Sequence, residues 1–319
     1  MSKREIKFKD AIAEAIYLEM QRDPRIFMVG DDILDLKQRS VTENIREKFP
    51  ERIIETPLIE DMIGGIGLGM SMGGLVPIIN LNCGAFLMLA IDAIYRLGVW
   101  RYRMAESINP VVIFRIGHYG CLGRGPEISA SFLATVLHLP NVLIFTPATP
   151  YHAKGLLRTA LTANKPTLFF EHKKLYELKG LIPDEEYIIP SCASTVLRPG
   201  QHITIISWMY TAYMAMEAAQ LLAREGIEAE VIALHTLNPI DIATIFFSVD
   251  KTRRSVIVEE DMLRGGVGAE IGAQIAEYVP GCLIKRVASK NVPLAPGRNE
   301  DFVAPTVKEV VAVCKTLLL

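Results

Sequence analysis

The sequence predicts an α/β protein in which two parallel sheets, each layered with helices, follow one another along the chain. At 319 residues the chain has room for two ordinary domains. Its residues are 50% hydrophobic and 22% charged, which excludes the disordered, low-complexity and collagen-like classes. Short β-rich runs alternate with longer helical patterns, and this alternation is typical of parallel α/β folds.

The first half of the chain opens with an amphipathic helix. Its apolar residues run from Phe8 to Met20 at helical spacing, and Asp23-Pro24 ends the pattern. Six buried strands are then predicted between helical segments, at Ile26–Val29, Arg52–Glu55, Val76–Leu81, Val111–Phe114, Val142–Phe145 and Thr167–Phe170.

A linker is predicted between Ile182 and Gly200, because this segment holds three prolines and a short acidic run without a helical period. We therefore place a domain boundary there, with domains at residues 1–190 and 191–319. The second domain should be a smaller doubly wound α/β unit. Its predicted elements are the strands His202–Ser207, Ala229–Leu234 and Ser255–Glu259, helices at Met209–Arg224, after Asn238-Pro239 and from Gly266, and a terminal helix near Val307–Leu317.

Charge and cysteine content narrow the class of protein. The formal net charge is -2, so the chain has no excess of basic charge to bind a phosphate backbone, and nucleic acid is not an expected partner. The five cysteines stand singly without a CxxC pair, which favours a reducing compartment over a disulfide framework or a zinc site. The polar N-terminus and the polar residues that interrupt the apolar stretch 74–100 predict a cytoplasmic protein without a membrane span.

The segment Thr56–Gly74 is the most unusual of the chain, and three interpretations compete for it. A dinucleotide fingerprint fails because its glycines are not in GxGxxG register. The glycines Gly65, Gly69 and Gly73 recur every four residues, which on a helix forms a flat stripe that lets another backbone approach. Glu60 stands between a strand and this helix, where it is either a ligand-binding carboxylate or a helix-dipole or capping residue.

A second glycine-rich segment, His118–Glu127, follows the strand Val111–Phe114 and carries a histidine, an arginine and a glutamate. It is either a pocket-lining loop or a surface turn. The other histidines show no metal-ligand spacing. No GxSxG, Walker or HExxH motif is present, so hydrolase, nucleotide-hydrolase and zincin interpretations lack support.

From Glu60 and its glycine helix onward, the sequence resembles the beta subunit of the thiamine-diphosphate-dependent decarboxylase component of 2-oxo acid dehydrogenase complexes, in the transketolase-like superfamily. The resemblance covers nearly the whole chain in order. It continues through Phe86–Ile94, Leu143–Leu161, His202–Ser207, Glu225–Asp241, Gly265–Ile271 and Asn291–Pro296.

The resemblance implies a pyrimidine-binding thiamine-diphosphate fold followed by a smaller transketolase C-terminal-like domain. Glu60 then matches the glutamate that hydrogen-bonds N1′ of the aminopyrimidine, where proton sharing prepares the cofactor for attack on a ketone. Phe86 matches the aromatic residue that packs on the pyrimidine ring, although the bare sequence would place it in the core. Leu58 and Asn82 are the further cofactor-binding candidates.

The resemblance also implies a partner subunit. The family binds the cofactor's diphosphate and Mg²⁺ through a GDG motif, and the nearest sequence here, Gly30-Asp31-Asp32, lacks the second glycine. We therefore expect an alpha-type subunit to carry that site in an α2β2 assembly, and the chain to be inactive alone. A lipoyl-bearing acyltransferase or an acyl carrier protein is the expected acceptor.

One position departs from the family pattern. Ile128 stands where dehydrogenase members carry a histidine after the glycine loop, and isoleucine cannot transfer a proton. His118 or Glu127 is then the candidate for that role. Two alternatives stay open: a transketolase-like subunit that moves a two-carbon unit from a ketose, and a beta-like subunit without turnover.

Overall fold

The chain folds into two compact units. The computed structural model describes residues 2–31, 33, 41, 43–104 and 109–319. The first unit comprises Met1–His118 and His138–Ser191, and the second comprises Tyr119–Leu137 and Cys192–Leu319. The segment Tyr119–Leu137, which the sequence places before the boundary, thus clusters with the second unit.

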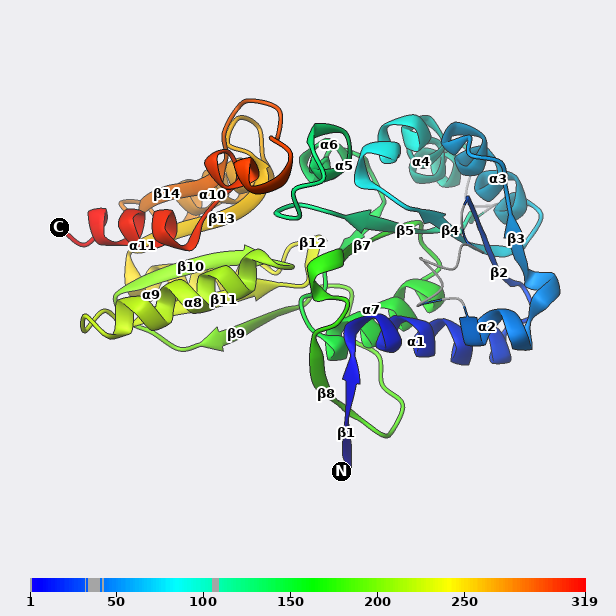
Figure 1. Cartoon of the computed structure of the whole chain (residues 1–319), viewed down its shortest axis with the longest axis horizontal. Helices are drawn as coiled ribbons and strands as arrows, with labels where there is room; N and C mark the ends of the chain where they lie inside the picture. The colour runs from blue at the N-terminus through cyan, green and yellow to red at the C-terminus, as the bar shows by residue number, and fades with distance from the viewer. Residues whose placement is uncertain (1, 32, 34–40, 42, 105–108) are drawn as a thin grey trace. The chain divides into compact units, whose positions relative to one another are not determined.

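The first unit is built on a parallel sheet with strand order β6-β7-β5-β4-β2-β3. Helices α1 and α7 pack together on one face of this sheet, and α3 and α4 pack together on the other (Figure 1). The strands are β2 (Ile26–Gly30), β3 (Ile53–Glu55), β4 (Val76–Leu81), β5 (Ile113–His118), β6 (Leu143–Phe145) and β7 (Thr167–His172). The helices are α1 (Phe8–Arg22), α2 (Glu43–Lys48), α3 (Glu60–Met72), α4 (Leu87–Arg103) and α7 (Pro150–Thr162). A separate antiparallel pair joins β1 (Lys3–Lys7) to β8 (Lys179–Pro183).

Local sequence explains these helices. The apolar residues predicted for the first helix are buried in α1, from Phe8 to Met20. Helix α7 begins at Pro150 and is capped by Thr149, whose hydroxyl accepts a hydrogen bond from the backbone N–H of His152. The proline and the capping threonine together fix the residue at which α7 starts. Ordinary helix-start signals in the sequence therefore account for this helix layer of the first unit.

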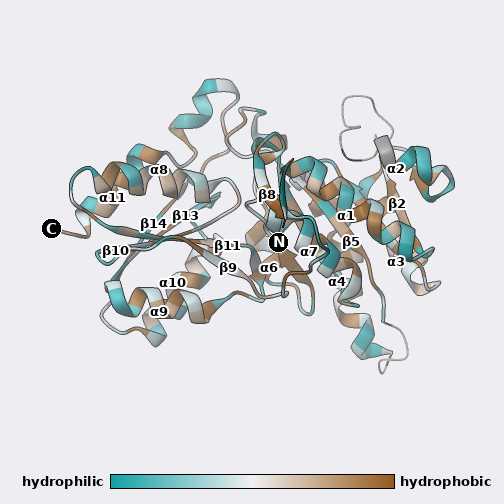
Figure 2. Ribbon diagram, turned by 90° about the horizontal axis from the view of Figure 1, so that it is seen from below, coloured by the Kyte–Doolittle hydropathy of each residue, from teal (hydrophilic) through white to brown (hydrophobic). Residues whose placement is uncertain are grey.

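The second unit has a five-stranded sheet with strand order β14-β13-β10-β11-β9, parallel except for the antiparallel edge strand β9. Helices α8 and α11 cover one face, and α9 and α10 cover the other (Figure 2). The strands are β9 (Ser194–Arg198), β10 (Ile203–Trp208), β11 (Ala229–Leu234), β13 (Arg254–Met262) and β14 (Leu283–Ser289), with the short β12 (Thr236–Asn238). The helices are α5 (Pro126–Ser129), α6 (Leu133–Leu137), α8 (Thr211–Ala223), α9 (Ile242–Thr252), α10 (Val267–Tyr278) and α11 (Val307–Thr316).

The predicted α/β class is confirmed, and each strand predicted in the first half is present. The linker predicted over Ile182–Gly200 is wrong in part, because Ser194–Arg198 forms β9 at the edge of the second sheet. An edge strand needs only one hydrogen-bonded neighbour and one buried face, so its mixed polar sequence gives little signal.

The predicted glycine stripe is also wrong for the packing of this chain. A Cβ added at Gly65 or Gly69 would meet nothing within 4 Å among the described residues. The glycines that the fold requires are Gly64, which packs against Ala90 and Ala93 of α4, and Gly67, where a Cβ would lie 2.8 Å from Ile79. The buried face of α3, with Ile63, Gly64, Gly67, Leu68 and Ser71, is therefore a different face from the predicted stripe.

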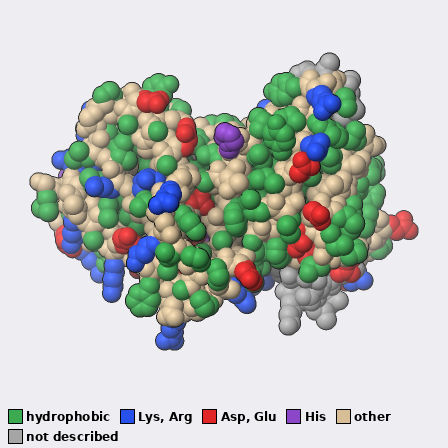
Figure 3. Space-filling view, turned by 90° about the horizontal axis from the view of Figure 1, so that it is seen from above, with side chains coloured by type: hydrophobic (Ala, Val, Ile, Leu, Met, Phe, Trp, Pro, Cys, Tyr) green, Lys and Arg blue, Asp and Glu red, His purple; other side chains and the backbone are tan. Residues whose placement is uncertain are grey.

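The surface carries charges of both signs. On the face seen in Figure 3, basic and acidic side chains are interspersed among hydrophobic ones. Within the described residues, no helix combines the length and apolar character needed to cross a membrane. All five cysteines are free thiols.

Candidate functional site

The candidate site lies at the carboxyl edge of the first unit's sheet. The strands of this sheet run parallel, so the residues that follow β3, β4, β5 and β7 emerge at the same edge. This is the edge at which parallel α/β sheets bind ligands. Most of the polar and aromatic residues that the sequence singled out stand here.

Glu60 is a buried carboxylate at the start of α3. It is the first residue of the helix, and only 7% of its surface is exposed. Its side chain makes no hydrogen bond and no ion pair with any residue that the structure describes. Glu60 does not cap the helix, since Ile59 occupies the N-cap position and the Glu60 carboxylate makes no hydrogen bond to the N–H groups of the first turn. Its place in the first turn of α3 is compatible with the helix-dipole interpretation, which stays open beside the ligand-binding one.

Asn82, at the end of β4, is held by its neighbours. Its side-chain nitrogen donates to Oδ2 of the buried Asp31 at 2.9 Å, and its side-chain oxygen accepts from Asn80 at 2.8 Å. A Cβ at Gly117 would lie 2.1 Å from the Asn82 carbonyl oxygen, so only glycine fits beside it. This network fixes the backbone that leads into the next turn. Asp32, the last residue of the partial diphosphate motif, lies outside the described residues.

That turn, η2 (Gly84–Phe86), carries the predicted aromatic residue. Phe86 is partly buried, and its backbone N–H donates to the carbonyl of Cys83 at 3.1 Å. Cys83 is buried, and burial raises the pKa of its thiol; the nearby Glu60 charge adds to the rise and Lys173 opposes it. Glu60 and Lys173 are thus both electrostatic neighbours of Cys83. Leu58, by contrast, is 63% exposed.

A network of charged and polar side chains connects β5, β7 and the segment that follows β7. Arg115 of β5 and Glu171 of β7 form a buried bidentate pair with nitrogen–oxygen distances of 2.6 and 2.9 Å. The Tyr176 hydroxyl donates to Glu171 at 2.6 Å and accepts from Nζ of Lys173 at 2.6 Å. Burial acts to raise the pKa of Glu171, but Arg115, Lys173 and Tyr176 together outweigh it and hold that pKa below its usual range.

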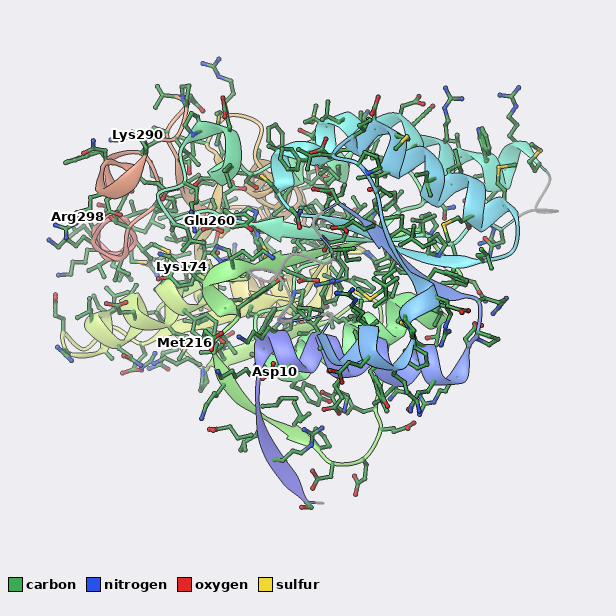
Figure 4. All side chains as sticks on the ribbon, turned by 45° about the vertical axis from the view of Figure 1, so that its right-hand side comes forward. Asp10, Lys174, Met216, Glu260, Lys290 and Arg298 are labelled. Carbon is green, nitrogen blue, oxygen red and sulfur yellow. The ribbon has the colours of Figure 1, made fainter. Side chains whose placement is uncertain are left out.

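Lys173 opens the short helix η3 (Lys173–Leu175) after β7, where Figure 4 labels its neighbour Lys174. Burial lowers the pKa of Lys173 to about 8, and the Arg115 charge lowers it further, while Glu171 and Cys83 act in the opposite direction. The lysine is therefore a half-buried residue of the candidate site whose charged form is disfavoured by burial. Sequence reasoning missed it, because a lysine after a strand is ordinarily a solvated surface residue.

His118 ends β5 and is 1% exposed. Its ring centroid lies 5.1 Å from that of His172, which ends the neighbouring strand β7. The backbone N–H of Lys174 donates to Nδ1 of His172 at 3.2 Å. Sequence spacing does not pair the two histidines, because their pairing follows from the register between β5 and β7.

The rest of the glycine-rich loop belongs to the second unit. Glu127 is exposed on the short helix α5, and Ile128 is 37% exposed beside it. The loop is fixed within that unit, because the backbone N–H of Gly123 donates to the buried Glu300 and Gly297 donates to the carbonyl of Gly123 at 2.8 Å. A Cβ at Gly123 would lie 2.9 Å from the Gly297 backbone, which explains the glycine.

The structure thus gathers Glu60, Asn82, Phe86 and His118 at one edge of the first unit. It adds Lys173 and Cys83 to that edge. Their roles as catalytic or cofactor-binding residues stay predictions, as does the role of Glu127.

Comparisons with known proteins decide the family. Residues 4–179 match the family described as transketolase, pyrimidine binding domain, and residues 193–310 match transketolase, C-terminal domain. The chain is 35% identical to the 2-oxoisovalerate dehydrogenase subunit beta of Bacillus subtilis over 303 residues, which is 91% of each chain. It is 35% identical to the chloroplastic pyruvate dehydrogenase E1 component subunit beta-3 of Arabidopsis thaliana, over 98% of this chain and 79% of the relative.

The chain belongs to the family of E1 beta subunits within the transketolase-like superfamily. An E1 beta subunit is also what the sequence resemblance predicted, and that prediction is confirmed. Another relative is the acetoin:2,6-dichlorophenolindophenol oxidoreductase subunit beta of Cupriavidus necator, 34% identical over 98% of this chain and 97% of the relative.

A solved structure shares the fold of this beta subunit. The chain described as "Split gene transketolase, inactive beta4 tetramer" superimposes with a TM-score of 0.80 at 23% identity, and 98% of each chain is covered. At this identity the likeness establishes the fold and nothing about the reaction.

Proposed function

We propose that this chain is the beta subunit of a thiamine-diphosphate-dependent 2-oxo acid dehydrogenase component. With an alpha-type subunit it would cleave a 2-oxo acid and pass the acyl unit to a carrier such as a lipoyl domain. The names of its relatives support this reading, since two of the three are beta subunits of 2-oxo acid dehydrogenases. None of those names refers to ketose transfer or to a subunit without activity.

The single observation that carries the proposal is the state of Glu60. Glu60 is 7% exposed, and the described residues supply neither a cation nor a hydrogen-bond donor in contact with its carboxylate, so this acceptor is open to a bound ligand. An aminopyrimidine ring nitrogen is a group that would satisfy it. The residues present therefore fit the pyrimidine half of thiamine diphosphate, with Phe86 offering an apolar face to the ring.

The chemistry is divided between cofactor and protein. Thiamine diphosphate, when bound, supplies a thiazolium that holds the electrons released when a carbon–carbon bond next to a carbonyl breaks. Glu60 would hold a proton between its carboxylate and the ring nitrogen. The Asn82–Asp31 hydrogen bond would fix the turn that carries Phe86. His118 would exchange a proton with a bound substrate.

The diphosphate and Mg²⁺ are assigned to the alpha-type partner. The described residues Gly30 and Asp31 do not complete the family's motif, and Asp31 is engaged by Asn82. We therefore propose an α2β2 assembly in which this chain supplies the pyrimidine half of each site. The cytoplasmic location stays a prediction, because the relatives include bacterial and chloroplastic proteins.

Acetoin is a second candidate substrate. The Cupriavidus relative, whose name refers to acetoin, matches over nearly its whole length. Acetoin carries a hydroxyl-bearing carbon where a 2-oxo acid carries its carboxylate, so cleavage would release acetaldehyde instead of carbon dioxide. The two-carbon unit that remains would be the same as the one from pyruvate, and the electron acceptor would oxidise it to the acyl level.

The test uses the chain purified together with its alpha-type subunit, thiamine diphosphate and Mg²⁺. Pyruvate, branched 2-oxo acids, acetoin and ketose phosphates are supplied in turn with a dye acceptor. Release of carbon dioxide from a 2-oxo acid supports the proposal, acetaldehyde from acetoin alone favours the second candidate, and turnover of ketose phosphates alone contradicts both. Glu60→Gln keeps the size of the side chain and should abolish turnover, whereas normal turnover would disprove the role of Glu60.

A further inference from the structure

The glycine-rich loop of the second unit is paired with a segment far along the chain. The backbone N–H of Gly123 donates to Oε2 of Glu300, and the N–H of Gly297 donates to the carbonyl oxygen of Gly123 at 2.8 Å. An antiparallel β-bridge joins Arg124 to Pro296 beside these hydrogen bonds. These contacts fix where the loop lies within this unit.

Glu300 belongs to the 3-10 helix η4 (Gly297–Phe302), in which Figure 4 labels Arg298. The glutamate is 2% exposed. Its Oε1 has no hydrogen-bond partner among the described residues, whereas Oε2 accepts the hydrogen bond from the loop. Removing this acceptor would leave the N–H of Gly123 unpaired, which costs free energy where the backbone is shielded from water.

The point of contact requires a glycine in the loop. Gly123 has a positive φ of +67°, and a Cβ there would lie 2.9 Å from Cα of Gly297. Any side chain at this position would push the loop away from η4. Beyond α5 a second acid holds the chain, because the N–H of Ala134 donates to Oδ2 of Asp261 at 3.1 Å.

The contact with Glu300 reaches helix α5 through hydrogen bonds inside the loop. The N–H of Arg124 donates to the buried hydroxyl of Ser129 at 3.1 Å, and the N–H of Ser129 donates to the carbonyl of Gly125 at 2.9 Å. The loop and α5 therefore form one closed turn. The exposed residues Glu127 and Ile128 stand on this turn.

We propose that Glu300 is a positioning residue for the reaction: by accepting the N–H of Gly123 it sets the position of α5, and with it the positions of Glu127 and Ile128. This inference rests on the proposed function, in which Ile128 occupies the histidine position of the family and Glu127 is a candidate for that role. It adds a residue that lies 177 positions beyond Gly123 in the sequence. Such a residue affects turnover because reaction rates depend on the exact placement of the groups that meet the substrate.

The experiment uses the complex assembled with the alpha-type subunit. Glu300→Met keeps the length of the side chain and removes the acceptor, whereas Glu300→Gln keeps an oxygen that can accept from Gly123. Asp301→Leu is the matched control, because it removes the neighbouring acid of η4, which is exposed.

Each variant is compared with wild type by three measurements. The values of kcat and KM are determined with pyruvate and with 2-oxoisovalerate, and binding of thiamine diphosphate with Mg²⁺ is measured by calorimetry. Hydrogen–deuterium exchange of the peptides that cover the loop and α5, followed by mass spectrometry, reports how firmly the loop is held.

Loss of the acceptor should loosen the loop and slow the reaction. For Glu300→Met we expect exchange in the loop to be about tenfold faster, because one such hydrogen bond is lost. The ratio kcat/KM should fall by about tenfold to a hundredfold. Affinity for thiamine diphosphate should equal that of wild type, since the residues proposed to bind the pyrimidine belong to the first unit. Glu300→Gln should recover most of both losses, and Asp301→Leu should not differ from wild type.

A second pair of variants perturbs the same contact from the loop, and it decides the matter if Glu300→Met does not fold. Gly123→Ala forces a Cβ against Gly297 and should change exchange and kcat/KM as Glu300→Met does. Gly226→Ala is its matched control. Gly226 also has a positive φ, of +79°, but its Cβ would meet nothing within 4 Å in the described chain, so neither quantity should change.

These results separate the possible failures. Unchanged loop exchange in Glu300→Met and Gly123→Ala, or faster exchange with normal turnover, would overturn the inference and leave the proposed function intact. Equal losses in Glu300→Gln and Glu300→Met would assign the effect to the charge instead of the hydrogen bond and would also overturn it. A wild-type complex that neither binds thiamine diphosphate nor turns over a 2-oxo acid would overturn the proposed function, and the role of Glu300 with it.

Discussion

Glu259 in the second unit should make the stability of the protein fall as pH rises. This carboxyl group is fully buried in β13, and burial raises its pKa to about 8, with Asp261 adding to the rise. The N–H of Gly268 donates to one carboxyl oxygen at 3.0 Å, but the other oxygen has no hydrogen-bond partner among the described residues. Gly268 and the nearby Arg286 only partly offset the cost of burying the charge.

The sign and size follow from linkage. The folded state holds the Glu259 proton more tightly than the unfolded state, so the penalty is absent below the unfolded pKa of 4.5 and grows as pH rises to about 8. At about 1.4 kcal/mol per pKa unit, the shift costs up to about 5 kcal/mol at alkaline pH, of which about 2 to 3 kcal/mol develops between pH 6 and pH 9.

Glu259→Gln removes this titration, so the free energy of unfolding of the variant relative to wild type should rise by that amount between pH 6 and pH 9. Urea unfolding of both proteins at each pH measures it, and other titrating groups cancel in the difference. Glu277→Gln, at an exposed position of the adjacent helix α10, is the matched control. Its free energy of unfolding relative to wild type should change by less than about 0.5 kcal/mol between pH 6 and pH 9. Parallel stability curves for wild type and Glu259→Gln would refute the reasoning.

Two further predictions concern the first unit. Gly67→Ala should lower the free energy of unfolding by about 1 to 3 kcal/mol, because the new Cβ would lie 2.8 Å from Ile79. Gly65→Ala on the same helix should raise it by up to about 1 kcal/mol, because its Cβ would meet nothing within 4 Å in the described chain. Urea unfolding compares the two variants, and equal effects would contradict the assigned packing. Arg115→Met should cost about 3 to 5 kcal/mol, because Glu171 then stays buried without its cation. Arg115→Met combined with Glu171→Leu should recover much of that loss in thermal unfolding, and a double variant less stable than the single one would show that the pair itself is stabilising.

Much of the fold could be predicted because its strands are continuous apolar runs. Val76–Leu81 and Ala229–Leu234 form strands with the predicted bounds, since both are buried on both faces of a parallel sheet. The strands β1, β8 and β9 were missed, because each lies at an edge or in a two-stranded pair and has a mixed polar sequence. Local sequence cannot show which partner such a strand will find.

The candidate site was predictable only where a residue stands in a motif. Glu60 and Phe86 came from the resemblance, and the structure places both at the carboxyl edge of the sheet. Lys173 and Glu171 follow β5 and Arg115 by more than fifty positions, so their network depends on the register between β5 and β7. Gly65 and Gly69 of the predicted stripe meet no other element of the described chain for the same reason, because the spacing of glycines does not show which face of α3 meets α4.

The role of Glu60 is tested most directly by an experimental structure of the assembled complex with thiamine diphosphate and Mg²⁺. We expect a Glu60 carboxylate oxygen within hydrogen-bond distance of the pyrimidine ring nitrogen, with the diphosphate held by the other subunit. A Glu60 side chain paired with a cation of the partner, and a pyrimidine ring bound elsewhere, would contradict it.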